Sequence, residues 1–454
     1  MEDITMRKIF QYIMLAVVTI VMASCTSDIE ETTATTAKNN VQLVVGEFPA
    51  FGDSQTRAIG TPDEGKTSWA VGDELLLEID NTSYGRHNAT FTYNGKSWEL
   101  TSGELVYLEG DPAYISHVYY APNYKWSNTS LMLKKGKVAG TDELIEGKAR
   151  ITGNGETITV SFAEATRKYS RLRIATLPNE QITVDTEYFT PAGSSDMEQN
   201  GNYTLTSDEK GNAYLYGTFD NNSEVTVKYR EAALTTYTFS QATESAKSYA
   251  LDATVISANS AEEIKSAIEQ KVADGKTTIR LNLAPNAGTD EFMAIREAIK
   301  GAAPNDLGTI ELTIIGVETI PEEAFYKMLQ LKSVKMSDVK EIKKYAFKEC
   351  KYLTVVEAPS LNKLCSGAFK KCDQLSKLTF GPINYADERN WPIFEYITPS
   401  IDLILSDYQK EMIETDDYLY TANNDRDYAG SDEHNSKNFL GREFKSITCR
   451  YRVE

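Results

Sequence analysis

Cysteine and histidine are scarce in this chain of 454 residues, which holds five cysteines and three histidines. The cysteines form no C-x-x-C pair, and His87, His117 and His434 lie in unrelated stretches without an H-E-x-x-H pattern. Zinc sites require clusters of such ligands at short spacing. We therefore expect no metal site and no cofactor, and we interpret the histidines as scattered surface side chains.

Sequence motifs of enzymes are also missing. The chain has neither a G-x-S-x-G nucleophile motif nor a glycine-rich phosphate loop. Its 66 acidic residues always offer some pair of carboxylates, so a pair alone does not indicate acid–base catalysis. The tyrosine-rich stretch at 107–126 is explained most simply by packing between sheets. We expect a protein that is not an enzyme, and an enzyme acting on surface polysaccharide is the least favoured hypothesis.

Positive charge is in short supply. The chain has 47 lysines and arginines against 66 acidic residues, a formal net charge of -19. Such a field repels phosphate backbones unless a local basic patch offsets it, and no such patch stands out in the sequence. We therefore expect no nucleic acid among the partners.

One long apolar run stands near the N-terminus. Residues 9–22, "IFQYIMLAVVTIVM", follow the basic "MRK" at 6–8, where translation starts if Met6 is the initiator, and precede "ASC". This order is typical of a signal peptide, and the run is shorter than the stretch of about 20 apolar residues that a membrane-spanning helix needs. The Thr-rich, acidic stretch that follows cannot build a packed core and is expected to be a flexible tether.

The end of that run, "VMASC" at 21–25, resembles the lipobox of bacterial lipoproteins. The resemblance implies that Cys25 is lipidated and becomes the first residue of the mature chain; an ordinary secretory signal cleaved nearby is the alternative. Acidic residues soon after the cysteine resemble the surface-export signal of lipoproteins of the Bacteroidales. This likeness implies a lipid-anchored protein on the outer face of the outer membrane.

Short runs of β-branched and aromatic residues, divided by turn signals such as "NG" and "GN", fill the chain from about 41 to 254. Their number and length predict two β-sandwiches in series. The segment contains "TRA" at 56–58, "WAVGDEL" at 69–75, "FTYNGKSW" at 91–98, "GTDELIEGKA" at 140–149 and "ITVSFAEATRKYSRLRI" at 158–174. In the order and spacing of these stretches it resembles the fimbrillin-like proteins of the Bacteroidales, although Ala163 and Glu164 stand where that family has a histidine.

Arg57 has a specific place in this resemblance. In fimbrillins a trypsin-like protease cuts after an arginine near the start of the first sandwich, and a neighbouring subunit's strand fills the groove left by the lost strand. Here "VQLVVGEF" at 41–48 is the strand that would be lost. An unpaired sheet edge offers the backbone donors and acceptors that strand exchange requires. An uncut loop arginine is an equally open reading.

The pattern changes near residue 257. "SANSAEEIKSAIEQKVADG" at 257–275 predicts a helix with Ser260 as N-cap and Glu263 as its capping-box partner. A strand at 277–283, a helix over "DEFMAIREAIKGA" and a strand at 309–315 follow.

A 22-residue repeat follows these elements and is the strongest signal in the chain. Phe325, Phe347 and Phe369 are each 22 residues apart. The same step links six further apolar columns: Val317, Val339 and Leu361; Ile320, Ile342 and Leu364; Ala324, Ala346 and Ala368; Met328, Cys350 and Cys372; Leu331, Leu353 and Leu375; Val334, Val356 and Leu378. This period predicts a leucine-rich solenoid in which each turn buries these columns on its neighbours.

The pattern A-F-x-x-C-x-x-L is similar to the BspA-like leucine-rich repeats of surface proteins, strongly over 309–380 and weakly near the C-terminus. Because Met328 shares a column with Cys350 and Cys372, we expect buried free thiols there. A disulfide between adjacent turns is the alternative, ahead of a metal site. The D-x-D arrangement of Asp425 and Asp427 does not fit an EF-hand loop and is read as a solvated loop.

The sequence thus predicts a multidomain protein, an all-β double sandwich followed by an α/β leucine-rich-repeat solenoid. The expected divisions are a signal peptide at 1–24, a tether at 25–40, sandwiches at 41–175 and 176–255, and the repeat domain at 256–454.

By resemblance, the protein acts in adhesion as an accessory or tip component of a fimbria. Its partners would be other fimbrial subunits by strand exchange, a host or microbial surface protein or glycan, and the outer membrane through the lipid. A monomeric surface binding module for host protein or glycan, without a pilus role, is the alternative.

Overall fold

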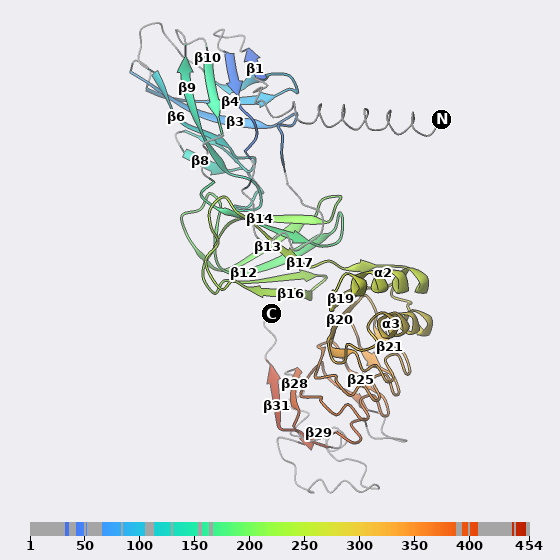
Figure 1. The fold of residues 1–454 in the computed structure, drawn as a ribbon. Helices are drawn as coiled ribbons and strands as arrows, with labels where there is room; N and C mark the ends of the chain where they lie inside the picture. The colour runs from blue at the N-terminus through green and yellow to red at the C-terminus, as the bar shows by residue number, and fades with distance from the viewer. Residues whose placement is uncertain are drawn as a thin grey trace, which may run out of the picture.

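The computed structural model describes most of the chain from residue 32 to residue 450 as two β domains and a solenoid (Figure 1). The described ranges are 32–35, 42–49, 51, 66–82, 85–104, 113–128, 130–152, 157–162, 167–386, 393–397, 400–406, 438–439 and 442–450. Within these ranges, neither helix combines the length and the apolar character that crossing a bilayer requires.

The first β domain is one sheet with the strand order β1-β2-β10-β9-β6-β3-β4-β5 and a small hairpin, β7-β8. Strands at both ends of this order supply one core: Leu43 and Val45 come from β2, and Trp98 comes from β5. The sheet therefore curls around its core. The strands are β1 Thr32–Thr35, β2 Gln42–Val45, β3 Glu74–Asn81, β4 Gly85–Tyr93, β5 Trp98–Gly103, β6 Ala113–Tyr120, β7 Tyr124–Ser127, β8 Ser130–Leu133, β9 Ile145–Thr152 and β10 Thr157–Ser161.

The second β domain is a seven-stranded sheet with the order β16-β15-β12-β14-β11-β17, in which β13 pairs with β12. Its strands are β11 Ser170–Ala175, β12 Gln181–Pro191, β13 Glu198–Thr206, β14 Asn212–Phe219, β15 Glu224–Tyr229, β16 Ala232–Thr238 and β17 Ser248–Asp252. We expected the first sandwich to extend to residue 175, but β11 lies in this second sheet, between β14 and β17. The change of sheet therefore precedes Ser170. Two all-β domains in series are observed: the first is one large sheet with the separate β7-β8 hairpin, and the second is a single hydrogen-bonded sheet.

The third part begins with helices α2, Ala261–Ala273, and α3, Thr289–Ala302. Ser260 caps α2 as predicted: its side chain accepts a hydrogen bond from the Glu263 backbone N–H, and the Glu263 carboxylate accepts one from the Asn259 N–H. These hydrogen bonds satisfy backbone donors that the first turn of a helix leaves without a partner.

The solenoid is built on a parallel sheet with the order β18-β19-β20-β22-β24-β26-β28-β31 and a second row of two-residue strands, β21-β23-β25-β27. The first set is β18 Ile256–Ser257, β19 Thr278–Asn282, β20 Ile310–Ile315, β22 Leu331–Met336, β24 Val355–Ala358, β26 Lys377–Phe380, β28 Asp402–Ser406 and β31 Ser446–Arg450; the second is β21 Thr319–Ile320, β23 Glu341–Ile342, β25 Lys363–Leu364 and β27 Tyr385–Ala386. A short hairpin, β29 Asn438–Phe439 with β30 Arg442–Glu443, precedes β31.

The repeat columns are buried as predicted, and every member has an exposed fraction of 5% or less. The phenylalanine rings stack along the axis, with centroid distances of 5.1 Å between Phe325 and Phe347 and 5.3 Å between Phe347 and Phe369. The stack continues to Phe394 at 5.7 Å from Phe369. The solenoid core is therefore one continuous aromatic and aliphatic column.

Helices lie only at the start of the described solenoid, so the expected α/β repeat needs correction. In each later turn, left-handed residues bend the chain at 22-residue intervals, as at Glu323 and Tyr345 with φ of 56° and 58°. Backbone bonds then join the turns directly: Phe325 N–H donates to Ala346 O over 2.7 Å, and Phe347 N–H donates to Ala368 O over 2.9 Å. These hydrogen bonds give partners to backbone N–H and C=O groups that, in a helix, would be paired within the helix itself.

The solenoid continues past the clear sequence repeat. Lys377 pairs with Asp402, a step of 25 residues, and Asp402 pairs with Ser446, a step of 44 residues, with residues between them outside the described ranges. The weak repeat signal near the C-terminus thus corresponds to further strands of the same sheet.

The second β domain packs on the first turns of the solenoid. Ile315 of β20 belongs to the hydrophobic core of that β domain. Arg280 of β19, which is 6% exposed, donates to the carbonyl of Leu234 over 2.6 Å and lies 3.8 Å from Asp252. The outer face of the solenoid sheet is therefore covered at its start and supported there by the β domain.

Candidate functional site

Several residues singled out from the sequence lie outside the described residues. These are the lipidation candidate Cys25, the processing candidate Arg57, the acidic pair Asp425 and Asp427, and His434. Their roles stay predictions.

The two repeat cysteines lie where the 22-residue column predicts. Cys350 and Cys372 are fully buried free thiols, and each donates to a backbone carbonyl of the preceding turn over 3.0 Å. Burial raises the pKa of the Cys350 thiol to about 12 and that of Cys372 well above its usual value. A thiol held protonated is a poor nucleophile and a poor metal ligand, so these side chains serve packing.

The described histidines do not come together. His87 is on β4, and His117 on β6 is exposed, with its Nδ1 3.4 Å from Glu146. Among the described residues, no group of three potential ligands forms a metal site.

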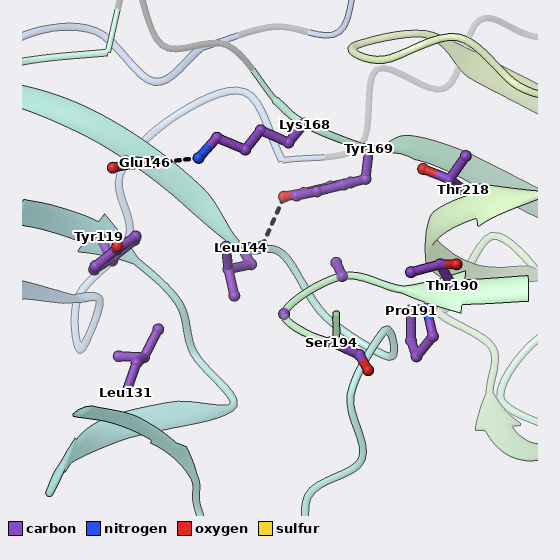
Figure 2. Close-up of a pocket in the computed structure, with 12 residues that line it drawn as sticks. Tyr119, Leu131, Leu144, Glu146, Lys168, Tyr169, Thr190, Pro191, Ser194 and Thr218 are labelled. Atoms are coloured by element: carbon purple, nitrogen blue, oxygen red, sulfur yellow. Dashed lines mark hydrogen bonds and ion pairs between the residues drawn. The ribbon is translucent and has the colours of Figure 1, made fainter. Parts of the chain in front are cut away.

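A hollow of about 310 Å³ lies where the two β domains meet (Figure 2). Its rim carries an ion pair of 2.8 Å between Lys168 and Glu146, and that interaction lowers the pKa of Glu146. Deeper in, the Tyr169 hydroxyl accepts a bond from the Leu144 N–H over 2.7 Å, and burial raises the pKa of Tyr169 well above its usual value. The other residues that line the hollow and are labelled in Figure 2 are Tyr119, Leu131, Thr190, Pro191, Ser194 and Thr218.

A buried ion pair next to the hollow links Glu143 of the first β domain with Arg167 of the segment that leads into the second. Arg167 and Glu143 are 2% and 3% exposed and are directly paired; burial raises the pKa of Glu143, and the guanidinium opposes that rise. Arg167 also donates to the Pro49 carbonyl over 2.7 Å and lies 3.7 Å from the Phe51 ring centroid. The charged groups around the hollow are thus engaged with one another, which is the arrangement of a structural joint.

On the strand faces of the solenoid, lysines are neutralised by carboxylates of neighbouring turns. The pairs and their distances are Lys332–Glu311 at 2.7 Å, Lys335–Glu357 at 3.6 Å, Lys340–Glu318 at 2.6 Å, Lys363–Glu341 at 2.7 Å and Lys445–Asp402 at 3.0 Å. These faces have little unbalanced charge to offer a ligand.

The turn side of the solenoid differs. We name its exposed and half-buried residues the Lys–Tyr face: Tyr326, Lys327, Lys343, Lys344, Tyr345, Lys348, Lys351, Lys371 and Tyr396. Lys327 has a carboxylate neighbour, Glu349, at 3.7 Å, and the other lysines of the face form no ion pair with a described carboxylate. The Lys348 ammonium lies 4.5 Å from the Tyr345 ring centroid and 5.1 Å from that of Tyr326, so it bridges two successive turns.

This basic face corrects the expectation that the chain lacks a basic patch. Residues 319–380 contain twelve lysines, seven acidic residues and no arginine, a net charge of +5 within a chain of -19. Four of the lysines of the face, Lys343, Lys344, Lys348 and Lys351, lie in one turn, separated by apolar and acidic residues, and Lys327 and Lys371 come from the turns on either side, so no unbroken run marks them in the sequence. Counting charge within the repeat segment would have revealed them.

Comparison with known proteins gives limited matches. No curated protein matches the chain. A crystal structure of a provisionally assigned cell adhesion protein from Bacteroides fragilis is similar at 11% identity and a TM-score of 0.27, covering 50% of this chain and 93% of that one. Residues 306–402 match the family described as the BspA type leucine rich repeat region, in six copies.

Proposed function

We propose that this protein is a cell-surface binding protein of the adhesion type, with the solenoid as its binding surface. The Lys–Tyr face carries the proposal, because it combines charge and aromatic rings on a regular, rigid frame. Solenoids present such extended surfaces, and their buried columns leave the exposed positions free to vary. The hollow between the β domains offers no comparable set of uncommitted charges.

The two β domains act as a support in this proposal. The second one is fixed to the first solenoid turns by Arg280 and Ile315, which are buried away from the Lys–Tyr turns. Lipidation at Cys25 would anchor the N-terminal end to the outer membrane and would leave the solenoid as the outermost part. The proposed partners are a host or microbial surface protein or glycan, and the protein is not an enzyme.

An accessory or tip position in a fimbria is the second candidate function, and β2 supports it. Leu43 and Val45 of β2 are fully buried, and the strand lies parallel to β10. Loss of β2 after a cut at Arg57 would expose an apolar groove beside β10 that a strand of another fimbrial subunit could fill. A C-terminal solenoid would obstruct further exchange, which favours a terminal position.

An adhesion assay tests the first proposal. Beads coated with the full chain are added to epithelial cells and to bacterial lawns, alongside beads with the variant Tyr345→Ala/Lys348→Ala. The matched control is Tyr114→Ala/Lys125→Ala, which changes the same residue types in the first β domain. We expect adhesion to fall with the solenoid variant alone. Equal adhesion by both variants, or loss with the control alone, would reject the solenoid as the binding surface.

A further inference from the structure

The strongest unexplained feature is the contrast between the two sides of the solenoid. The chain has 66 acidic residues, and on the strand faces it places one beside each of Lys332, Lys335 and Lys340. On the turn side, Lys343, Lys344, Lys348 and Lys351 fall within nine residues that contain one acidic residue, Glu349. The adjacent turns add Glu322, Glu323 and Asp373, but none of these described residues forms an ion pair with the four lysines. Like charges so close together repel one another, so this side gains from an anion brought from outside.

From this contrast we propose that the Lys–Tyr face binds an extended acidic polysaccharide, through the sulfate or carboxylate groups that such polymers carry at regular intervals. The inference rests on the proposed role of the solenoid as the binding surface and names the ligand class. Turns of the solenoid repeat about every 4.8 Å along the axis. Lys327, Lys348 and Lys371 come from three successive turns, and Lys348 reaches the Tyr326 ring of the preceding turn at 5.1 Å, so ammonium groups recur along the axis and a linear polyanion can contact several of them.

The aromatic rings favour a glycan over a single-stranded nucleic acid. Nucleic-acid grooves use open aromatic faces on which bases stack, together with arginines. Here Lys344 and Lys348 lie 4.9 Å and 4.5 Å from the centroid of the Tyr345 ring, and Lys327 and Lys348 both lie 5.1 Å from that of Tyr326. The rings are thus already engaged by ammonium groups.

The nearby arginine is also committed. The Arg296 guanidinium of α3 donates to the carbonyl of Glu323 over 2.8 Å. The groups of the face that remain available to a ligand are the lysine ammonium groups, which form ion pairs with sulfate and carboxylate groups.

The composition of the face also argues against an acidic protein as partner. Cores of protein interfaces are poor in lysine and rich in large apolar and aromatic anchors. The Lys–Tyr face has lysine as its commonest residue, and Tyr396, at 62% exposure, is its one large side chain that stands well out from the surface. A surface of this kind gains binding energy from many weak ion contacts.

Binding to defined polymers tests the proposal with the full chain. The probes are heparin, which carries sulfate and carboxylate; polygalacturonate, which carries carboxylate alone; neutral dextran; a single-stranded oligothymidylate; and polyglutamate. Lys344→Glu/Lys348→Glu/Lys351→Glu is compared with the matched control Lys332→Glu/Lys335→Glu/Lys340→Glu, which has the same net charge but alters the paired faces. Equal thermal melting of the two variants checks that both fold, and Lys344→Gln/Lys348→Gln/Lys351→Gln serves if the first variant does not.

We expect heparin, polygalacturonate or both to bind, dextran not to bind, and the face variant to bind about 10- to 100-fold more weakly than the control. The relative response to the two anionic glycans identifies sulfate or carboxylate as the recognised group. Equal weakening in face and control variants, tighter binding of the oligonucleotide or of polyglutamate than of either glycan, or equal binding of dextran would overturn the proposal. If the chain adheres to cells but binds neither anionic glycan, the proposed ligand class is wrong while the adhesive role stands. If it binds an anionic glycan but does not adhere to cells, the adhesive role is wrong while the ligand class stands.

Discussion

At the scale of single residues, the repeat cysteines show how a column assigns a role. Cys350 and Cys372 replace Met328 in successive turns and are buried to the same degree. The carbonyls that accept from their thiols belong to the preceding turn, so both side chains also tie turns together. Their position was predictable from the spacing, because one apolar column tolerates either residue type.

Thiol labelling tests this role. We expect iodoacetamide at pH 8 to leave Cys350 and Cys372 unmodified in the folded protein and to modify both after unfolding, because burial holds the pKa of Cys350 at about 12 and that of Cys372 well above its usual value. Cys365 and Cys449, which are partly exposed, should react in the folded state. Peptide mass spectrometry reads the sites, and rapid labelling of Cys350 in the native protein would contradict the packing role.

The phenylalanine column allows a second prediction at this scale. Phe347 is stacked between two rings inside the column, whereas Phe444 near its end meets the Phe394 ring edge-on at 5.7 Å. We expect Phe347→Ala to lower the free energy of unfolding of the solenoid by about 3–5 kcal/mol, and Phe444→Ala to cost less. Urea unfolding followed by circular dichroism measures both, and an equal loss would show that the turns do not depend on continuous stacking.

At the scale of elements, the sequence predicted best those features that depend on residue spacing within a short segment. The helix cap at Ser260 and the buried columns follow from spacing along a short segment. The assignment of β11 did not, because all six of its residues are buried and its partners β14 and β17 come from 37 or more residues later in the chain. A strand that is buried on both faces shows no alternation of apolar and polar residues. Its sequence therefore does not indicate which of two sheets it joins.

Strand β2 gives the prediction at the scale of elements. The residues that follow β2 are held by aromatic contacts outside the sheet. The Phe48 ring lies 4.9 Å from that of Trp69. The guanidinium groups of Arg167 and Arg171 lie 3.7 Å and 4.5 Å from the centroid of the Phe51 ring. We therefore expect the N-terminal piece to stay bound after a cut at Arg57 in the absence of a partner strand.

Size-exclusion chromatography after arginine-specific cleavage checks this expectation, with and without urea. The piece should elute with the body of the protein in native buffer and separate in urea, and Phe48→Ala/Phe51→Ala should speed its release. Immediate separation in native buffer would mean that these contacts do not retain the strand.

At the scale of the whole molecule, the joint between the second β domain and the solenoid depends on contacts that no local pattern reveals. Arg280 lies in a strand of the solenoid sheet, yet its guanidinium donates to the carbonyl of Leu234 in β16. A buried arginine of this kind reads in the sequence as one more polar residue on a strand. The Lys–Tyr face was missed for a related reason, since members from different turns, such as Tyr326 and Lys348, come together only through the stacking of turns.

Removing the side chain of Arg280 tests the joint. Arg280→Ala leaves the Leu234 carbonyl without its charged donor in a buried place, so we expect a loss of about 1.5–3 kcal/mol in the free energy of unfolding. Proteolysis between the β domain and the solenoid should become faster. Lys265→Ala on the exposed side of α2 is the control and should change neither quantity; an equal effect of both changes would argue against a specific joint.

The central claim is that the solenoid, through its Lys–Tyr face, is the binding surface of this protein. The most direct test of this claim compares hydrogen–deuterium exchange of the full chain bound to cell-surface glycan with exchange of the free chain. The account predicts slower exchange in peptides covering 321–331, 343–353 and 365–375, and no change in peptides of the first β domain such as 74–103. Protection confined to the β domains, or to the hollow around Tyr169, would contradict it.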